Sequence, residues 1–454
     1  MKKILLLIAV TLSAYSLKAQ SELTLPLFDD VFQSSYLKPT VRPEHTISIG
    51  LPGISSIYIQ GIHNGFIPNS VVSKANDTTW FSPSRMLGEL SDQNMLFANA
   101  DIDLFHLRIR VYNWDYWFGV RQRHSLSFFY PKDLMSLAVH GNADFVGEVL
   151  DFGYLGLNAS LYREYTFGMA TEFNSWVFGG RVSLLQGLSS LYLKPQMLQL
   201  SIDDDMYAHT FASDATLYSA GIPLTEDRMP NEALFSNTKW LTSYLTRLRN
   251  PGASLALGVS YKYDQRTTFS FSVSDLGFIH WSDSTVNYKV RGDSPFQGVD
   301  ALGDFLYGRD IDIDSTLNVF RSNFDDEEFQ QAYTTWLSPK FYLSANYQLA
   351  SRTNLGFQLY GIVNRRFYPA VSLGITQGIG RAFNLALTGS FNQRTITNLG
   401  FGLMVKPGPF QIYMIADNYF TPLKDPFTFT NLNFRLGVNL VFGRVKTAKY
   451  LPYR

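Results

Sequence analysis

The stretch LNFRLGVNLVFG, residues 432–443, alternates between bulky apolar residues and small or polar ones. One parity carries Leu432, Phe434, Leu436, Val438, Leu440 and Phe442, and the other carries Asn433, Arg435, Gly437 and Asn439. A β-strand points successive side chains to opposite faces. The stretch is therefore predicted to form a strand with one large apolar face and one lean, polar face.

The same alternation recurs along the chain. It is clear in residues 105–111, 255–263, 269–274, 341–349, 371–376, 383–388 and 399–406. Segments of about ten residues with this period, separated by turn residues, are the sequence signature of a transmembrane β-barrel. Residues 45–454 are therefore predicted to form an all-β, antiparallel transmembrane β-barrel of about 14 strands.

A soluble β-sandwich is the alternative, because its strands alternate as well. Aromatic residues favour the barrel: they make up 15% of the chain and cluster near expected strand ends, as at Tyr112, Trp114, Tyr116 and Trp117. Aromatic girdles at the two membrane boundaries would account for such clusters. Beyond the N-terminus no apolar run approaches the ~18 residues of a spanning helix. A membrane crossing by this chain therefore requires strands closed into a barrel.

The first residues, MKKILLLIAVTLSAYSLKAQ, place two lysines before an apolar run and a small residue at Ala19. This layout predicts a secretory signal peptide over residues 1–19. A membrane anchor is the alternative, but the apolar run is far below the ~20 residues that a spanning helix needs. The chain has no cysteine, and its 38 basic residues balance 38 acidic ones. We therefore expect a protein of the bacterial outer membrane, with no electrostatic footprint for nucleic acid.

Residues 20–44 contain Pro26, Pro39 and Pro43 and show no clear period. They are predicted to be an N-terminal segment that lies in the barrel lumen as a plug, with an unattached tail as the alternative. Short connections at 264–267 and 406–410 contain turn residues. Long stretches without alternation, at about 62–100, 213–252 and 282–338, are expected outside the barrel or folded into it. Short loop helices are predicted within 238–252 and 325–337, from apolar residues at helical spacing.

No common catalytic or nucleotide-binding motif appears in the sequence, and we expect neither an enzyme nor a cofactor. Asp310, Asp312 and Asp314 have the spacing of a calcium loop. However, Ser315 and Arg321 replace the glycine and glutamate that such a loop needs, so a solvated acidic loop is favoured over a metal site. A barrel enzyme could assemble its site from distant strands, for example from His106 or His124 with a strand serine, but no local pattern supports one.

The candidates for lumen-facing residues are charged and amide side chains on the strand face that carries small and polar residues. They are Arg108, Arg110, Arg435, Asn433 and Asn439. An arginine there must be paired or hydrated, since at the bilayer midplane it would cost ~2–4 kcal/mol. One interpretation is a structural ion-pair network that includes Glu164 or Glu172. The other is a basic patch that holds the carboxylate of a ligand.

Several phrases resemble an uncharacterised family of outer-membrane barrels from Bacteroidota. They lie at 130–147, 179–188, 250–281 and 398–420, and SDLGFIHW at 274–281 is the most specific of them. That family is in turn similar to long-chain fatty-acid transporters and to barrels associated with the type nine secretion system. The resemblance implies an outer-membrane barrel, mostly of fourteen strands, with an N-terminal segment in its lumen. It implies no catalytic motif.

These observations favour passive transport or uptake of small apolar or amphipathic molecules across the outer membrane. The alternative is an accessory or anchoring barrel of a protein secretion system, in which long loops grip another protein. The expected partners are the lipid bilayer and either a small apolar ligand or a secretion-system protein. An enzyme is the third and least supported reading.

Overall fold

The computed structural model describes residues 22–65, 72–75, 78–204, 209–221, 249–296, 325–380, 382–391, 398–418 and 431–444, and the statements below concern these residues. The predicted signal peptide, the candidate helix at 240–248 and the acidic loop at 310–321 lie outside them.

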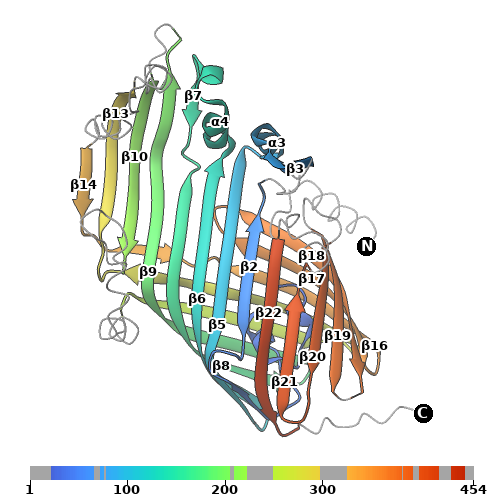
Figure 1. Ribbon diagram of the computed structural model, residues 1–454. Coiled ribbons are helices and arrows are strands. Elements are labelled where there is room, and N and C mark those ends of the chain that lie inside the picture. Colours follow the sequence, from blue (N-terminus) through green and yellow to red (C-terminus); the bar gives the residue numbers. More distant parts are fainter. Residues whose placement is uncertain are drawn as a thin grey trace.

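Within the described ranges, fourteen strand crossings form one closed antiparallel barrel (Figure 1), as predicted. The first crossing is shared by β1 (Ile47–Gly50) and β2 (Ile57–His63), and each of them pairs with both β5 and β22. This double pairing closes the ring. The other crossings, in ring order, are β5 (Gln93–Val111), β6 (Trp114–Pro131), β8 (Gly156–Phe173), β9 (Trp176–Ile202), β11 (Pro251–Lys262), β12 (Thr267–Trp281), β16 (Lys340–Ala350), β17 (Thr353–Val363), β18 (Phe367–Ile379), β19 (Phe383–Phe391), β20 (Asn398–Val405), β21 (Phe410–Ala416) and β22 (Asn431–Phe442).

The two faces of the sheet differ as the alternation requires. In β22 the side chain of Leu436 is 42% exposed, whereas its neighbour Arg435 is 1% exposed. Large apolar residues are exposed on the same parity around the ring, including Phe118, Phe167, Phe178, Leu257, Phe271, Leu343, Phe357, Leu373, Leu387 and Ile412. A continuous apolar outer surface over a polar interior is the distribution of an outer-membrane-type barrel.

The two ends of the barrel differ in the length of their connections. Short turns at 112–113, 174–175, 263–266, 351–352 and 406–409 gather at the end where β1 begins and β22 ends. The predicted turns at 264–267 and 406–410 are confirmed to within one residue. The longer connections lie at the other end, which is the outward-facing end in bacterial barrels.

The long connections carry structure of their own. They contain the hairpin of β3 (Val72–Ala75) and β4 (Thr78–Phe81), the helices α3 (Pro83–Glu89) and α4 (Lys132–His140), the short 3-10 helix η3 (Ala143–Phe145), and the strands β7 (Val149–Asp151), β10 (His209–Ala220), β13 (Asn287–Phe296), β14 (Asp325–Phe329) and β15 (Tyr333–Trp336). None of the described helices is long and apolar enough to cross a membrane.

The prediction of a short helix within 325–337 is wrong, because this segment forms β14 and β15. β14 pairs with β13 and β15 pairs with β12, as at Asn287 with Phe329 and Trp281 with Tyr333. Backbone pairing with a neighbouring strand overrides helical spacing here, since local propensity is a weak determinant when a sheet edge is available. The expectation that 62–100 lies outside the barrel or folded into it is wrong at its end, because β5 begins at Gln93 and pairs with β2 there.

The long β9 continues beyond the barrel and carries a sheet outside it (Figure 1). β10, β13 and β14 pair in succession on one side of it, and β7 pairs with its other side. Helix α4 packs Leu134 and Leu137 against Leu150, Phe152 and Leu200 of this region. We call these five strands, β7, β9, β10, β13 and β14, the outer sheet.

We predict that a charge on the apolar outer surface destabilises the barrel in lipid. Leu373 lies midway along β18 and is 59% exposed. Leu373→Arg should lower the free energy of unfolding from lipid vesicles by ~2–4 kcal/mol, because the guanidinium would face hydrocarbon. Tyr263→Arg, in the turn between β11 and β12, is the matched control and should have a much smaller effect. Equal effects of the two variants in denaturant titrations would contradict a lipid-facing surface.

Candidate ligand cavity and barrel interior

The N-terminal segment, which we define as residues 22–44, lies inside the ring of strands. Its only described regular structure is two 3-10 turns, η1 (Leu25–Leu27) and η2 (Phe32–Tyr36). It touches widely separated strands: Thr24 bonds Thr388 of β19, and Thr40 bonds Ser260 of β11. The approach is close enough that a Cβ on Gly179 of β9 would lie 2.2 Å from a segment carbonyl oxygen. A glycine at this inward position therefore makes room for the segment.

Arg435, Asn433 and Asn439 of β22 are all buried. Arg435 donates to Glu22 at 2.5 Å. Asn439 donates to the side-chain oxygen of Gln33 at 2.9 Å. Arg435 and Asn439 therefore hold the N-terminal segment, and the guanidinium of Arg435 is paired. Among the described residues, the side-chain nitrogen of Asn433 is buried without a hydrogen-bond partner.

Arg108 and Arg110 lie at the other end of the segment, near the short turns. Both pair with Asp115 of β6, with Arg110 Nε at 3.0 Å. Arg42 of the N-terminal segment joins them, with its Nε 2.8 Å from Asp115 and its Nη1 3.0 Å from Glu172. The arrangement is an ion-pair cluster, and the cations that the sequence singled out are divided between two separate places.

His45, the first residue after this segment, is buried beside Arg108. Its carbonyl oxygen accepts a hydrogen bond from Arg108 at 2.8 Å. Burial, and then the positive charge of Arg108, lower the pKa of His45 from 6.5 to about 3, although Asp30 opposes this shift. The imidazole is therefore neutral in the folded chain at ordinary pH.

A second ion-pair network crosses the interior above the segment, and sequence reasoning found only one of its members, Glu164. It joins four cations, Arg121, Arg123, Arg181 and Lys340, to three carboxylates, Asp101, Glu164 and Asp275. The shortest pair is Arg121 to Glu164 at 2.6 Å. Tyr36 of the N-terminal segment lies under Arg121, 4.2 Å from ring centroid to guanidinium carbon, and donates to Asp103 at 2.7 Å.

Asp275 is the hub of this network, and its position depends on a β-bulge in β12. The register between β11 and β12 shifts at this point, and Asp275 has a left-handed φ of 58°. As a result Ser274 and Asp275 are both buried, although neighbouring residues of a regular strand face opposite sides. Asp275 receives both terminal nitrogens of Arg123, at 3.1 and 3.2 Å, and Lys340 at 2.9 Å. In the sequence, two successive polar residues between Val273 and Leu276 are the signal of this bulge.

The edge of β12 that faces away from β11 loses its regular pairing at this bulge. Pairing with β16 ends at Ser274 opposite Lys340, and pairing with β15 begins at Phe278 opposite Trp336. Between them one backbone bond is formed, from Leu337 N–H to the carbonyl oxygen of Gly277, at 2.9 Å. The next residues include Pro339, which has no N–H to donate.

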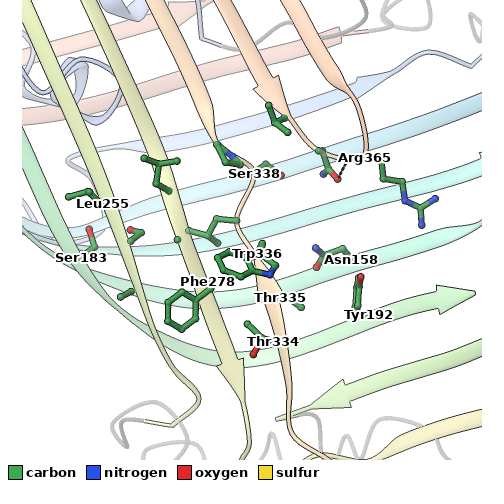
Figure 2. Close-up of a pocket in the computed structure, with 18 of the residues that line it drawn as sticks. Asn158, Ser183, Tyr192, Leu255, Phe278, Thr334, Thr335, Trp336, Ser338 and Arg365 are labelled. Carbon is green, nitrogen blue, oxygen red and sulfur yellow. Dashed lines mark hydrogen bonds between the residues drawn. The ribbon is translucent and has the colours of Figure 1, made fainter.

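A cavity of about 870 Å³ lies at this interruption (Figure 2). Leu255, Leu276 and Phe278 line it from the apolar outer face, whereas Ser183 and Ser254 are buried on the inner face. Side chains from both faces of the sheet thus line one cavity, so the cavity extends through the barrel wall. Its inner part also meets Asn158, Tyr192 and Arg365 (Figure 2).

A smaller, polar cavity of about 60 Å³ adjoins the first one, and the two share Asn158, Asn364 and residues 335–338 as lining. Arg123, Asp275 and Lys340 of the ion-pair network line the smaller cavity. Neutral hydrogen-bonding groups also line it, among them Gln60, Asn99, Ser125, Ser127 and Ser160, beside apolar side chains such as Ile62 and Phe97. An apolar space in the wall therefore leads to a polar space in the interior.

The barrel axis is obstructed toward the long connections, because opposite walls meet there. Phe97 of β5 packs edge-on against Tyr368 of β18, with centroids 5.7 Å apart. Arg365, in the turn between β17 and β18, donates to the carbonyl oxygen of Tyr154 and lies over the ring of Phe129 at 4.5 Å. The N-terminal segment occupies the other half of the interior, where a cavity of about 580 Å³ is lined both by this segment and by residues of β11, β12, β16 and β17.

The histidine positions carry no catalytic arrangement among the described residues. His106 does face a strand serine, with its Nε2 3.2 Å from Ser48 Oγ, but both side chains are fully buried. Phe32 stacks on the imidazole at 4.0 Å, and Nδ1 has no hydrogen-bond partner, so no carboxylate orients the ring. His124 lies on the outer face of β6. In the described part of the chain no three His, Cys, Asp or Glu residues are grouped to hold a metal ion.

One family model matches residues 39–417, which is most of the chain. The chain belongs to the family of unknown function DUF5723. No curated protein matches it. The DUF5723 match spans β1 to β21 and includes the bulge, the ion-pair network and the wall cavity.

Among solved structures, the chain resembles outer-membrane transporters. The toluene transporter TodX of Pseudomonas putida matches with a TM-score of 0.40 and 7% identity, over 90% of this chain and 93% of that one. The toluene transporter TbuX of Ralstonia pickettii matches at 0.35 and 8%, over 94% and 97%. A FadL homologue of Pseudomonas aeruginosa matches at 0.38 and 8%, over 94% and 100%.

We predict that acid loosens the N-terminal segment through His45. Because the pKa of His45 is about 3 in the folded chain and about 6.5 for a solvent-exposed imidazole, the unfolded chain binds more protons between these two pH values. The stability contribution is therefore present above pH 6.5 and is lost as pH falls from 6.5 toward 3. Proteolysis or hydrogen exchange of residues 22–44 should accelerate over this window, and His45→Gln should flatten the dependence. An unchanged profile in that variant would assign the loosening to another group.

Proposed function

We propose that this barrel carries small apolar molecules passively across the outer membrane, and that they pass between its interior and the bilayer through the wall cavity. The observation that carries the proposal is the 870 Å³ cavity lined from both faces of the sheet. Its outer part is apolar, which suits a molecule dissolved in lipid, and its volume lies in the range of small-molecule sites. Export by the N-terminal signal and insertion in the outer membrane are part of the proposal.

The obstructed axis supports this route over a water-filled pore. A hydrophilic solute would need a continuous axial path, and the N-terminal segment and the contact of Phe97 with Tyr368 both occupy that axis. An apolar molecule needs only the interrupted ladder beside β12. Interrupting a β-ladder in hydrocarbon is unfavourable because backbone groups lose their hydrogen-bond partners. We therefore attribute the interruption in the barrel wall to a role in transport.

An accessory role in protein secretion is the second candidate, and the outer sheet is the observation that favours it. This sheet extends past the barrel at the end with long connections and offers a surface to another protein (Figure 1). Uptake of a labelled apolar tracer by vesicles that contain the purified barrel, above protein-free vesicles, supports the transport role. Co-purification with secretion proteins, without uptake, would support the second.

We predict that filling the wall cavity strongly lowers uptake without unfolding the barrel. Ser254 lines the cavity from the inner face of β11, and Ser254→Phe would place a ring in it. Leu257→Phe on the same strand is the matched control, because Leu257 faces outward and does not line this cavity. Uptake should fall about tenfold or more in the first variant, as a blocked site would require, and stay near wild type in the control. Equal uptake by both variants would contradict the route through the wall.

A further inference from the structure

We infer that the cavity accepts uncharged molecules and rejects carboxylates, and that Asp275 sets this specificity by neutralising the cations that face the polar end. The inference rests on the proposed function and names its substrate class. The wall cavity and the polar cavity share lining residues, so the polar group of a molecule lodged in the wall would point at the polar cavity. The charge state of that cavity therefore decides which polar groups are accepted.

Two cations line the polar cavity, and Asp275 pairs with both of them. Arg123 makes a two-pronged contact with the carboxylate at 3.1 and 3.2 Å, and Lys340 lies 2.9 Å from its Oδ2. Arg181, further from the cavity, reaches the same carboxylate at 3.5 Å. The buried carboxylate of Asp275 thus pairs with three cations. It occupies the position that the carboxylate of a ligand would take.

The rest of the network is balanced in the same way. Arg121 pairs with Glu164 at 2.6 Å and lies 3.6 Å from Asp101. Asp103, which accepts a hydrogen bond from Tyr36 beside Arg121, adds a fourth buried carboxylic group next to this network. A ligand carboxylate would add an unbalanced charge in a buried site, which is unfavourable unless a cation is released to meet it.

Arg365, the remaining charge on the wall cavity, is already engaged. Its guanidinium donates to the carbonyl oxygens of Tyr154 and Leu155 and lies over the rings of Phe129 and Tyr154. The polar groups left to a ligand are neutral: the amides of Asn158 and Asn364 and the hydroxyls of nearby serines and threonines. Such groups suit a hydroxyl, carbonyl or amide on an otherwise apolar molecule.

The test compares 1-dodecanol with dodecanoate, which share a chain length and differ in charge at pH 8. Equilibrium binding of each radiolabelled compound is measured on the purified full chain in detergent. Dodecanol should bind the wild type about tenfold or more tightly than dodecanoate, since a buried unpaired charge is costly. Tighter binding of dodecanoate by the wild type would overturn the inference and leave the proposed function standing. Binding of neither compound would reject the proposed function itself.

The variant Asp275→Asn is the more specific test, because it should create a binding site for a carboxylate. With the carboxylate removed, Arg123 and Lys340 would face the cavity unpaired, and dodecanoate binding should strengthen about tenfold or more, the gain expected of a charge-assisted contact. Dodecanol binding should change little. Adding Lys340→Gln to that variant should reverse most of the gain.

Glu164→Gln is the matched control, because it removes a charge from the same network without lining either cavity. It should not strengthen dodecanoate binding. Equal gains in the two variants would show a general charge effect and contradict a specific role of Asp275. If Asp275→Asn fails to fold, the wild-type comparison of alcohol with acid still decides whether the cavity rejects carboxylates.

Discussion

Backbone hydrogen bonding in hydrocarbon is the constraint on which the rest of this structure depends. Every N–H and C=O of a chain that crosses a bilayer needs a partner, and strands meet this need only when the sheet closes on itself. Here closure rests on a short first crossing: β1 and β2 are separate strands of four and seven residues, and both pair with β5 and with β22. The closed ring then fixes which parity of every strand faces inward.

Closure also explains the charges inside. Once the apolar parity faces outward, the polar parity of fourteen strands faces a narrow common space, and its arginines must find carboxylates there. The ring brings together residues far apart in the chain, such as Arg123 with Asp275. The N-terminal segment, whose described regular structure is limited to two 3-10 turns, is held by the same means, through Glu22 at one end and Arg42 at the other.

The sequence was sufficient for the barrel because the decisive information is local. Alternation within a strand such as 432–443 needs only neighbouring residues, and the pairing of consecutive strands follows from short turns. The alternation was also sufficient to select Arg108 and Arg435 as residues on the face of small and polar side chains. Their partners could not be predicted, because Asp115 and Glu22 are chosen by the register of the closed sheet and by the path of a segment without period.

The same reasoning explains what the sequence concealed. The ion-pair hub and the wall cavity both arise from one irregularity, the bulge at Asp275, and a bulge appears in the sequence only as a slip of parity between Val273 and Leu276. The helix expected at 325–337 failed for a related reason: its apolar spacing fits a helix, but β12 and β13 offer open edges to it. Both cases concern the edge of a strand, where the available partner decides the structure.

The bulge connects the structural constraint to function. A regular β12 would pair with β16 along its whole length, and the wall would be closed on that side. The bulge turns Asp275 inward, and the ladder to β16 ends one residue before it, at Ser274 opposite Lys340. Three cations hold the inward-facing Asp275 in place. The charged residues of the barrel interior therefore also stabilise the interruption of the ladder between β12 and β16. The opening in the wall and the neutrality of the interior beside it therefore have one origin, and a change at Asp275 acts on both.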